Sequence, residues 1–143
     1  MKRFVPIIVL VALTSCAGGK TLSPVTQLSN HPLIGSLMRS FGITADQAVG
    51  TSGAVLALGQ NRMPATEWTK LASAIPDVSD IIKAGSAVGG IAGAPNSLAD
   101  LANPFANLGL SQQQVSILIP AVVDYVSRAA GPEVGGALAS VLK

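Results

Sequence analysis

The side chains best suited to chemistry are a single cysteine, Cys16, and a single histidine, His31. Histidine is the usual general base at neutral pH, and zinc sites combine several Cys and His ligands. One residue of each kind is too few for such a site, so the sequence predicts no metal and no cofactor. His31 precedes Pro32, and we interpret it as a solvated residue at a helix start.

No other group of polar residues has the spacing of a catalytic motif. Gly50-Thr51-Ser52-Gly53 contains a serine, but its sole candidate base is His31, whereas a nucleophilic serine needs a base and a group that orients it. The carboxylates suit capping and solvation better than calcium or glycosidase chemistry; they include Asp77, Asp80, Asp100 and Asp124. Phosphate-binding and nucleophile-elbow motifs are absent from the sequence. We therefore predict a protein that is not an enzyme.

The segment before Cys16 has the order of a secretory signal peptide. Lys2-Arg3 precede an apolar run over residues 4–13, and small residues follow. A transmembrane helix needs about 20 apolar residues, and Pro6 interrupts this shorter run. The sequence thus predicts a signal peptide over residues 1–15. An exported protein with a chance cysteine is the alternative, although a lone thiol is unusual in an oxidising compartment.

Leu13-Thr14-Ser15-Cys16 resembles the lipobox of bacterial lipoproteins, in which an aliphatic residue and two small residues precede cysteine. The resemblance implies a diacylglycerol on the Cys16 sulfur, cleavage before Cys16 and acylation of the new amine. Two or more acyl chains anchor a protein stably to a membrane. Ala17, rather than Asp, follows the cysteine, which is similar to lipoproteins sorted to the outer membrane. We expect a cell-envelope protein anchored through lipid on Cys16 at the periplasmic face of the outer membrane.

Composition limits the partners of the remaining chain, residues 16–143. Lys2 and Arg3 leave with the signal peptide, so seven of the nine basic side chains remain beside seven acidic ones. A neutral surface argues against nucleic acid, and one Trp, one Tyr and three Phe offer little for base stacking. We predict no nucleic-acid partner, and a protein partner or a homo-oligomer as the candidates.

Apolar spacing predicts an all-α domain over residues 31–143, a small compact bundle of six or seven short helices, behind a flexible tether over residues 16–30. The clearest helix starts are Thr44-Ala45-Asp46-Gln47 and Ser111-Gln112-Gln113-Gln114, which have the form of capping boxes. Further caps are expected at Asn30, Asp77 and Asn96-Ser97. Pro120 predicts a kink near Ser116 in the helix that follows the second box.

The two capping boxes, at Thr44 and Ser111, lie 67 residues apart, and the same shift aligns other segments. Phe41-Gly42-Ile43-Thr44 matches Leu108-Gly109-Leu110-Ser111, and residues 71–75 match residues 138–142. We interpret this as an internal repeat of two similar helix-turn-helix halves, about 31–84 and 96–143, that pack on each other or on a second protomer. A plain bundle with coincidental caps is the alternative.

A glycine-rich segment, residues 85–95, separates the two halves. Gly85, Gly89 and Gly93 are spaced as in membrane helices that pack closely, but the segment is too short to span a bilayer. We interpret it as a linker or mobile loop, with a membrane-associating glycine zipper as the alternative. Trp68 lies on the apolar stripe of its helix and is expected to pack in the core.

Several motifs look like the VcgC/VcgE-like bacterial domain of unknown function. They are Leu108-Gly109-Leu110-Ser111, Ile119-Pro120, Asp124-Tyr125-Val126 and residues 71–76. The resemblance covers about residues 33–143 and implies a small all-helical domain, often behind a signal peptide, without established catalytic residues.

The expected function is therefore that of a lipid-anchored, non-enzymatic structural or interaction module. A membrane-associating or oligomerising glycine-zipper protein and a carrier of a small apolar ligand are the alternatives.

Overall fold

The computed structural model describes residues 24–91 and 93–143, which form eight α-helices and one short 3₁₀-helix. The predicted signal peptide and Cys16 lie outside these residues. The helices are α2 (Pro24–Leu28), α3 (Pro32–Phe41), α4 (Ala45–Arg62), α5 (Ala65–Ala74), α6 (Val78–Gly89), η2 (Leu98–Leu101), α7 (Ala102–Asn107), α8 (Gln112–Ala130) and α9 (Pro132–Val141). The predicted all-α class is confirmed, with more helices than the six or seven expected.

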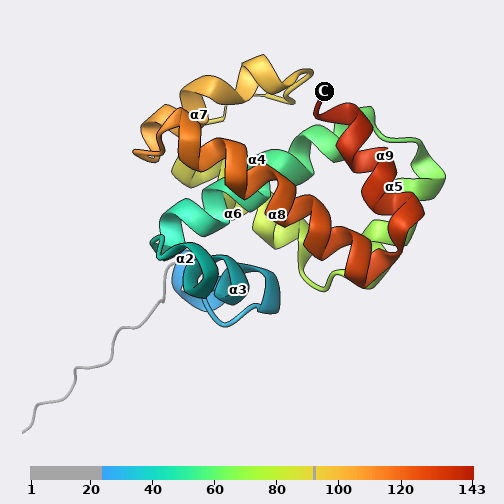
Figure 1. Ribbon diagram of the computed structural model, residues 1–143, viewed down its shortest axis with the longest axis horizontal. Coiled ribbons are helices and arrows are strands. Elements are labelled where there is room, and N and C mark those ends of the chain that lie inside the picture. Colours follow the sequence, from blue (N-terminus) through green and yellow to red (C-terminus); the bar gives the residue numbers. More distant parts are fainter. Residues whose placement is uncertain (1–23, 92) are drawn as a thin grey trace, which may run out of the picture.

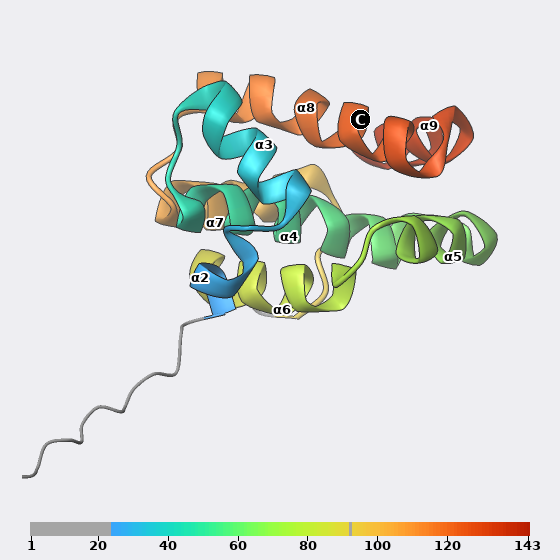
Figure 2. The ribbon, with the colours of Figure 1, turned by 90° about the horizontal axis from the view of Figure 1, so that it is seen from below.

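The fold is built around α4. Figure 2 shows α4 between α8 on one side and α6 with α2 on the other, and α4 packs against each of these helices. Every residue of α4 from Ala48 to Gly59 is buried. A helix buried on all sides needs small residues where its neighbours approach most closely, and this stretch of α4 is rich in Gly and Ala.

The backbones of α4 and α6 approach each other closely at Gly53 and Gly85. A Cβ atom on Gly53 would lie 2.6 Å from the Gly85 Cα and 2.6 Å from the Ile81 carbonyl oxygen. A Cβ on Gly85 would lie 2.6 Å from the Gly53 Cα. The two backbones therefore touch, because neither helix carries a side chain at the crossing.

This crossing corrects the prediction of a linker over residues 85–95. Helix α6 continues to Gly89, and the break begins at Gly90, which has a left-handed φ of 68°. Gly85 and Gly89 are buried within the fold, the second next to Pro104. Glycine's low helix propensity predicted a break, but packing against α4 keeps this segment helical.

The predicted tether is also wrong for its last residues. Residues 24–28 form α2, and Leu28 joins the core with 7% of its surface exposed.

The cap of α3 is not Asn30 but His31, whose Nδ1 accepts from the Leu33 N–H at 3.2 Å. Asp77 precedes α6 in a left-handed conformation (φ 59°) without a side-chain cap bond. Despite Pro120, residues 112–130 form a single helix.

Both predicted capping boxes are present. Thr44 accepts from the Gln47 N–H at 3.2 Å and Ser111 accepts from the Gln114 N–H at 3.2 Å, while each glutamine oxygen accepts from the N–H of its cap residue. The residues two positions before the caps, Gly42 and Gly109, are both left-handed.

The predicted repeat reappears in the helix bounds. A shift of 67 residues carries the first residues of α4 and α5, Ala45 and Ala65, onto those of α8 and α9, Gln112 and Pro132. The contacts are reciprocal, because α3 and α5 pack on α8 while α7 and α9 pack on α4. Figure 1 shows α8 crossing in front of α4.

The two halves differ at the turn after the long helix. Pro64 stands in one turn with φ −57°, and its equivalent, Gly131, has φ 108°, which proline cannot adopt. Gly135 of α9 then lies so close to α8 that an added Cβ would lie 1.7 Å from the Ser127 Oγ. The equivalent of Gly135 in α5 is Trp68, whose bulk does not allow this approach. Consequently α9 folds back on α8, whereas α5 packs mainly on the other half.

Candidate functional site

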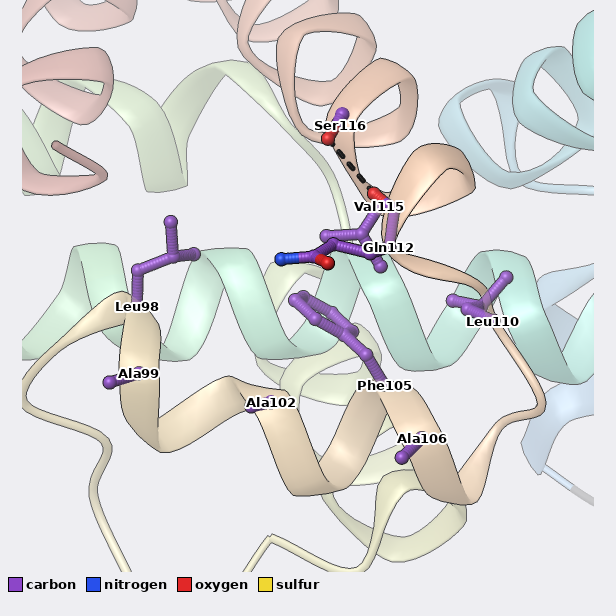
Figure 3. Close-up of a pocket in the computed structure, with 9 residues that line it drawn as sticks. All are labelled: Leu98, Ala99, Ala102, Phe105, Ala106, Leu110, Gln112, Val115 and Ser116. Carbon is purple, nitrogen blue, oxygen red and sulfur yellow. Dashed lines mark hydrogen bonds between the residues drawn. The ribbon is translucent and has the colours of Figure 1, made fainter.

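The described residues contain an apolar groove between η2 with α7 and the first turns of α8 (Figure 3). Its volume is about 540 Å³. Phe105 is 5% exposed and points from α7 towards Gln112 and Val115 of α8, and the Gln112 amide extends towards Leu98 in Figure 3. The lining residues are Leu98, Ala99, Ala102, Phe105, Ala106, Leu110, Gln112, Val115 and Ser116.

Local interactions place both walls of the groove. Ser97 caps η2 in a capping box with Asp100, whose carboxylate accepts from the Ser97 N–H at 3.0 Å and from the Asn96 N–H at 2.8 Å. The bond from Asn96 is the main reason that the pKa of Asp100 is lowered, and the Ser97 bonds act in the same direction. Left-handed Gly109 turns the chain from α7 towards α8, and the Ser111 box starts α8.

The chemistry of the groove is that of an apolar binding surface. No charged side chain lines it, and its polar side chains are those of Gln112 and Ser116. The Ser116 hydroxyl donates to the Gln112 carbonyl at 2.9 Å, as the dashed line in Figure 3 shows. This lining suits contact with an apolar group.

A second, shallower groove continues along α8. Its volume is about 430 Å³, and it lies between α8 and α9. It is lined by Ile119, Pro120, Val123, Asp124, Ser127, Ala139 and Leu142. Residues of α8 from both grooves follow one helical stripe, because their positions recur every three or four residues.

His31 is not the solvated residue that we expected. It is 6% exposed, and its Nε2 lies 2.8 Å from the carbonyl oxygen of Pro76. Because Nδ1 accepts from the Leu33 N–H, Nε2 is the ring nitrogen that donates to the Pro76 carbonyl. His31 therefore joins the start of α3 to the turn before α6. Sequence spacing could not reveal this role, because Pro76 is distant along the chain.

The remaining candidate residues do not converge on one site. Thr51 and Ser52 are fully buried in α4, and their hydroxyl oxygens have no hydrogen-bond partner. Trp68 is half-buried and packs against the core, as expected. Asp124 pairs with Arg128 at 2.9 Å on an exposed helix face. Tyr125 packs against the core, and burial raises the pKa of its hydroxyl.

The described ranges contain neither a metal-binding cluster nor a membrane-spanning helix. Residues 24–91 and 93–143 contain no cluster of three or more His, Cys, Asp or Glu side chains able to hold a metal ion. None of the helices formed by these residues is both long and apolar enough to cross a membrane.

The fold and the groove define a class, a small all-α domain with an apolar surface along one helix. A family model described as protein of unknown function VcgC/VcgE (DUF2780) matches residues 15–143. The chain belongs to this family, as its motifs indicated. No curated protein matches the chain. No solved structure matches it either.

Proposed function

We propose that this protein is a lipid-anchored, non-enzymatic module of the bacterial cell envelope, held through acyl chains on Cys16. The observation that carries the proposal is the order of residues before Cys16: a basic start, an apolar run and then Leu13-Thr14-Ser15-Cys16. The helical body is compatible with this role, since its apolar groove suits binding rather than catalysis.

Replacement of the acylated sulfur tests the anchor. We expect the Cys16→Ser chain to appear in the soluble fraction after cell lysis, and its mass to lack the acyl chains. The matched control is Ala17→Ser, which makes a similarly small change beside the cysteine and should leave the protein in the membrane fraction. A Cys16→Ser chain that stays in the membrane fraction as firmly as the native chain, with a mass unchanged apart from the substitution, would refute the proposal.

A second substitution tests the location. Asp after the lipid-bearing cysteine resembles the signal that retains lipoproteins in the inner membrane. We expect the native chain to co-sediment with outer membranes on a density gradient and the Ala17→Asp chain to co-sediment with inner membranes. Equal distribution of both chains would contradict the predicted outer-membrane location while leaving the anchor itself intact.

The groove between α7 and α8 favours a second candidate function, the carriage of a small apolar ligand. Its volume of about 540 Å³ lies in the range of small-molecule sites. A fluorescent fatty acid should bind the native chain, and Ala102→Trp should abolish binding because an indole at this exposed lining position would occupy the groove. The control is Ala87→Trp on α6, remote from the groove; equal binding by both variants would remove this candidate.

A further inference from the structure

The repeat exposes an asymmetry between α4 and α8. In the first half, α2 and α6 form a layer that covers α4. In the second half, α9 covers the equivalent side of α8 at its Ser127 end, where Gly135 packs on Ser127. The rest of that side, with Ser116, Pro120 and Asp124, is exposed, and Figure 2 shows α8 along one edge of the molecule. Helix α8 accordingly buries only Leu118, Val122 and Val126.

The shift of 67 residues shows which surface is uncovered. On α4, Val49 and Gly53 contact Gly85 of α6, and Ala57 and Gln60 lie beside the same helix. Their equivalents define the outer face of α8, together with the neighbouring Ile117 and Val123. This outer face comprises Ser116, Ile117, Pro120, Val123, Asp124 and Ser127.

This outer face has the properties of an unfilled helix contact. Ile117 is 53% exposed, and no other large hydrophobic side chain of residues 24–91 and 93–143 is exposed. Pro120 has no N–H, and its exposed ring stands at the middle of the face. The groove of about 430 Å³ beside Pro120 and Val123 could receive a branched side chain such as that of Ile117.

We propose that a second copy of this chain covers the outer face of α8, with the two α8 helices antiparallel about a two-fold axis near Pro120. The arrangement continues the packing already present inside one chain, where α4 of one half lies on α8 of the other. In the dimer, α8 would be covered on both sides, as α4 is covered by α6 and α8.

Complementarity of the face with itself favours this occupant. About an axis at Pro120, Ile117 of one copy comes to the level of Val123 of the other, which lines the partner's groove. Asp124 of one copy comes to the level of Ser116 of the other, and Arg128 to the level of Gln112. Each charged side chain is therefore paired with a neutral polar one. A parallel pairing would place like charges together and align the helix dipoles unfavourably.

Crosslinking in intact cells tests the proposal independently of the lipid anchor. Packed helix axes lie about 8–10 Å apart, so a short membrane-permeant bis-maleimide should join two full-length Pro120→Cys chains into a product of twice the mass. The matched control is Ala87→Cys, an exposed position on α6, which should give no dimer. The unsubstituted chain controls for Cys16.

A second substitution separates a specific contact from random collision. In the Pro120→Cys background, Ile117→Asp should lower the dimer yield at least tenfold, because it places a carboxylate in the partner's groove. The comparison is Ala87→Asp, which should leave the yield unchanged, and circular dichroism should show unchanged helicity in both. Absence of the dimer, adducts with a different protein alone, or a dimer insensitive to Ile117→Asp would overturn the proposal.

Discussion

Replacement of Gly53 by alanine tests the close crossing of α4 and α6. The new Cβ would lie 2.6 Å from both the Gly85 Cα and the Ile81 carbonyl oxygen. Carbon atoms pack at about 3.5–4.0 Å, so the two helices would have to separate by about 1 Å. Both obstacles are backbone atoms, and no change of rotamer relieves the contact.

The expected magnitude is a difference between two effects. Overpacking of a close contact costs about 1–3 kcal/mol, and the upper end applies because backbone must move. Alanine gains about 1 kcal/mol of helix propensity over glycine. The free energy of unfolding should therefore fall by about 2 kcal/mol, as measured by urea titration of the full chain with circular dichroism.

The chain offers a matched control at Gly136, in α9, where an added Cβ would meet no atom within 4 Å. Gly136→Ala should therefore raise the free energy of unfolding by about 0.5–1 kcal/mol through helix propensity alone. If Gly53→Ala stabilised the protein as Gly136→Ala does, the backbones of α4 and α6 would not touch at this point and the reasoning would fail.

Three further predictions concern local interactions. His31→Ala should lower the free energy of unfolding by about 2–3 kcal/mol, because the buried Leu33 N–H and the Pro76 carbonyl both lose a hydrogen-bond partner. His31→Asn should recover part of this loss by capping α3. Equal urea midpoints for the two variants would contradict this prediction. Because the pKa of Asp100 is lowered in the folded protein, its carboxylate stabilises the fold above the unfolded pKa, and this stabilisation is lost as pH falls through the folded pKa. The difference in melting temperature between the native and Asp100→Asn chains should therefore shrink on acidification. Gly131→Ala should cost about 1–3 kcal/mol, because φ 108° strains any residue with a Cβ, and an unchanged melting temperature would show that the α8–α9 turn can relax.

Sequence reasoning was most accurate where the determinants lie within a few residues of each other. The Thr44 and Ser111 capping boxes and the 67-residue repeat were read directly from the chain. A capping box joins residues three positions apart, so its pattern is complete within one short segment.

Predictions failed where a partner from a distant segment decides the outcome. The low helix propensity of glycine predicts a helix break at Gly85. Gly85 is nevertheless helical, because α6 packs there against Gly53 of α4. His31 was predicted to be a solvated residue at a helix start, yet it is buried and hydrogen-bonded to the Pro76 carbonyl. No sequence pattern predicted the groove beside Phe105, because its walls come from separate helices with ordinary apolar spacing.

The sequence by itself determined the helical class, the principal helix ends and the duplication, because backbone hydrogen bonds and turn conformations depend on neighbouring residues. Only the tertiary structure decided that α4 is enclosed, that α6 extends through its glycines and that most of the outer face of α8 is exposed. Burial depends on which distant segments meet, and that meeting is a property of the packed chain as a whole.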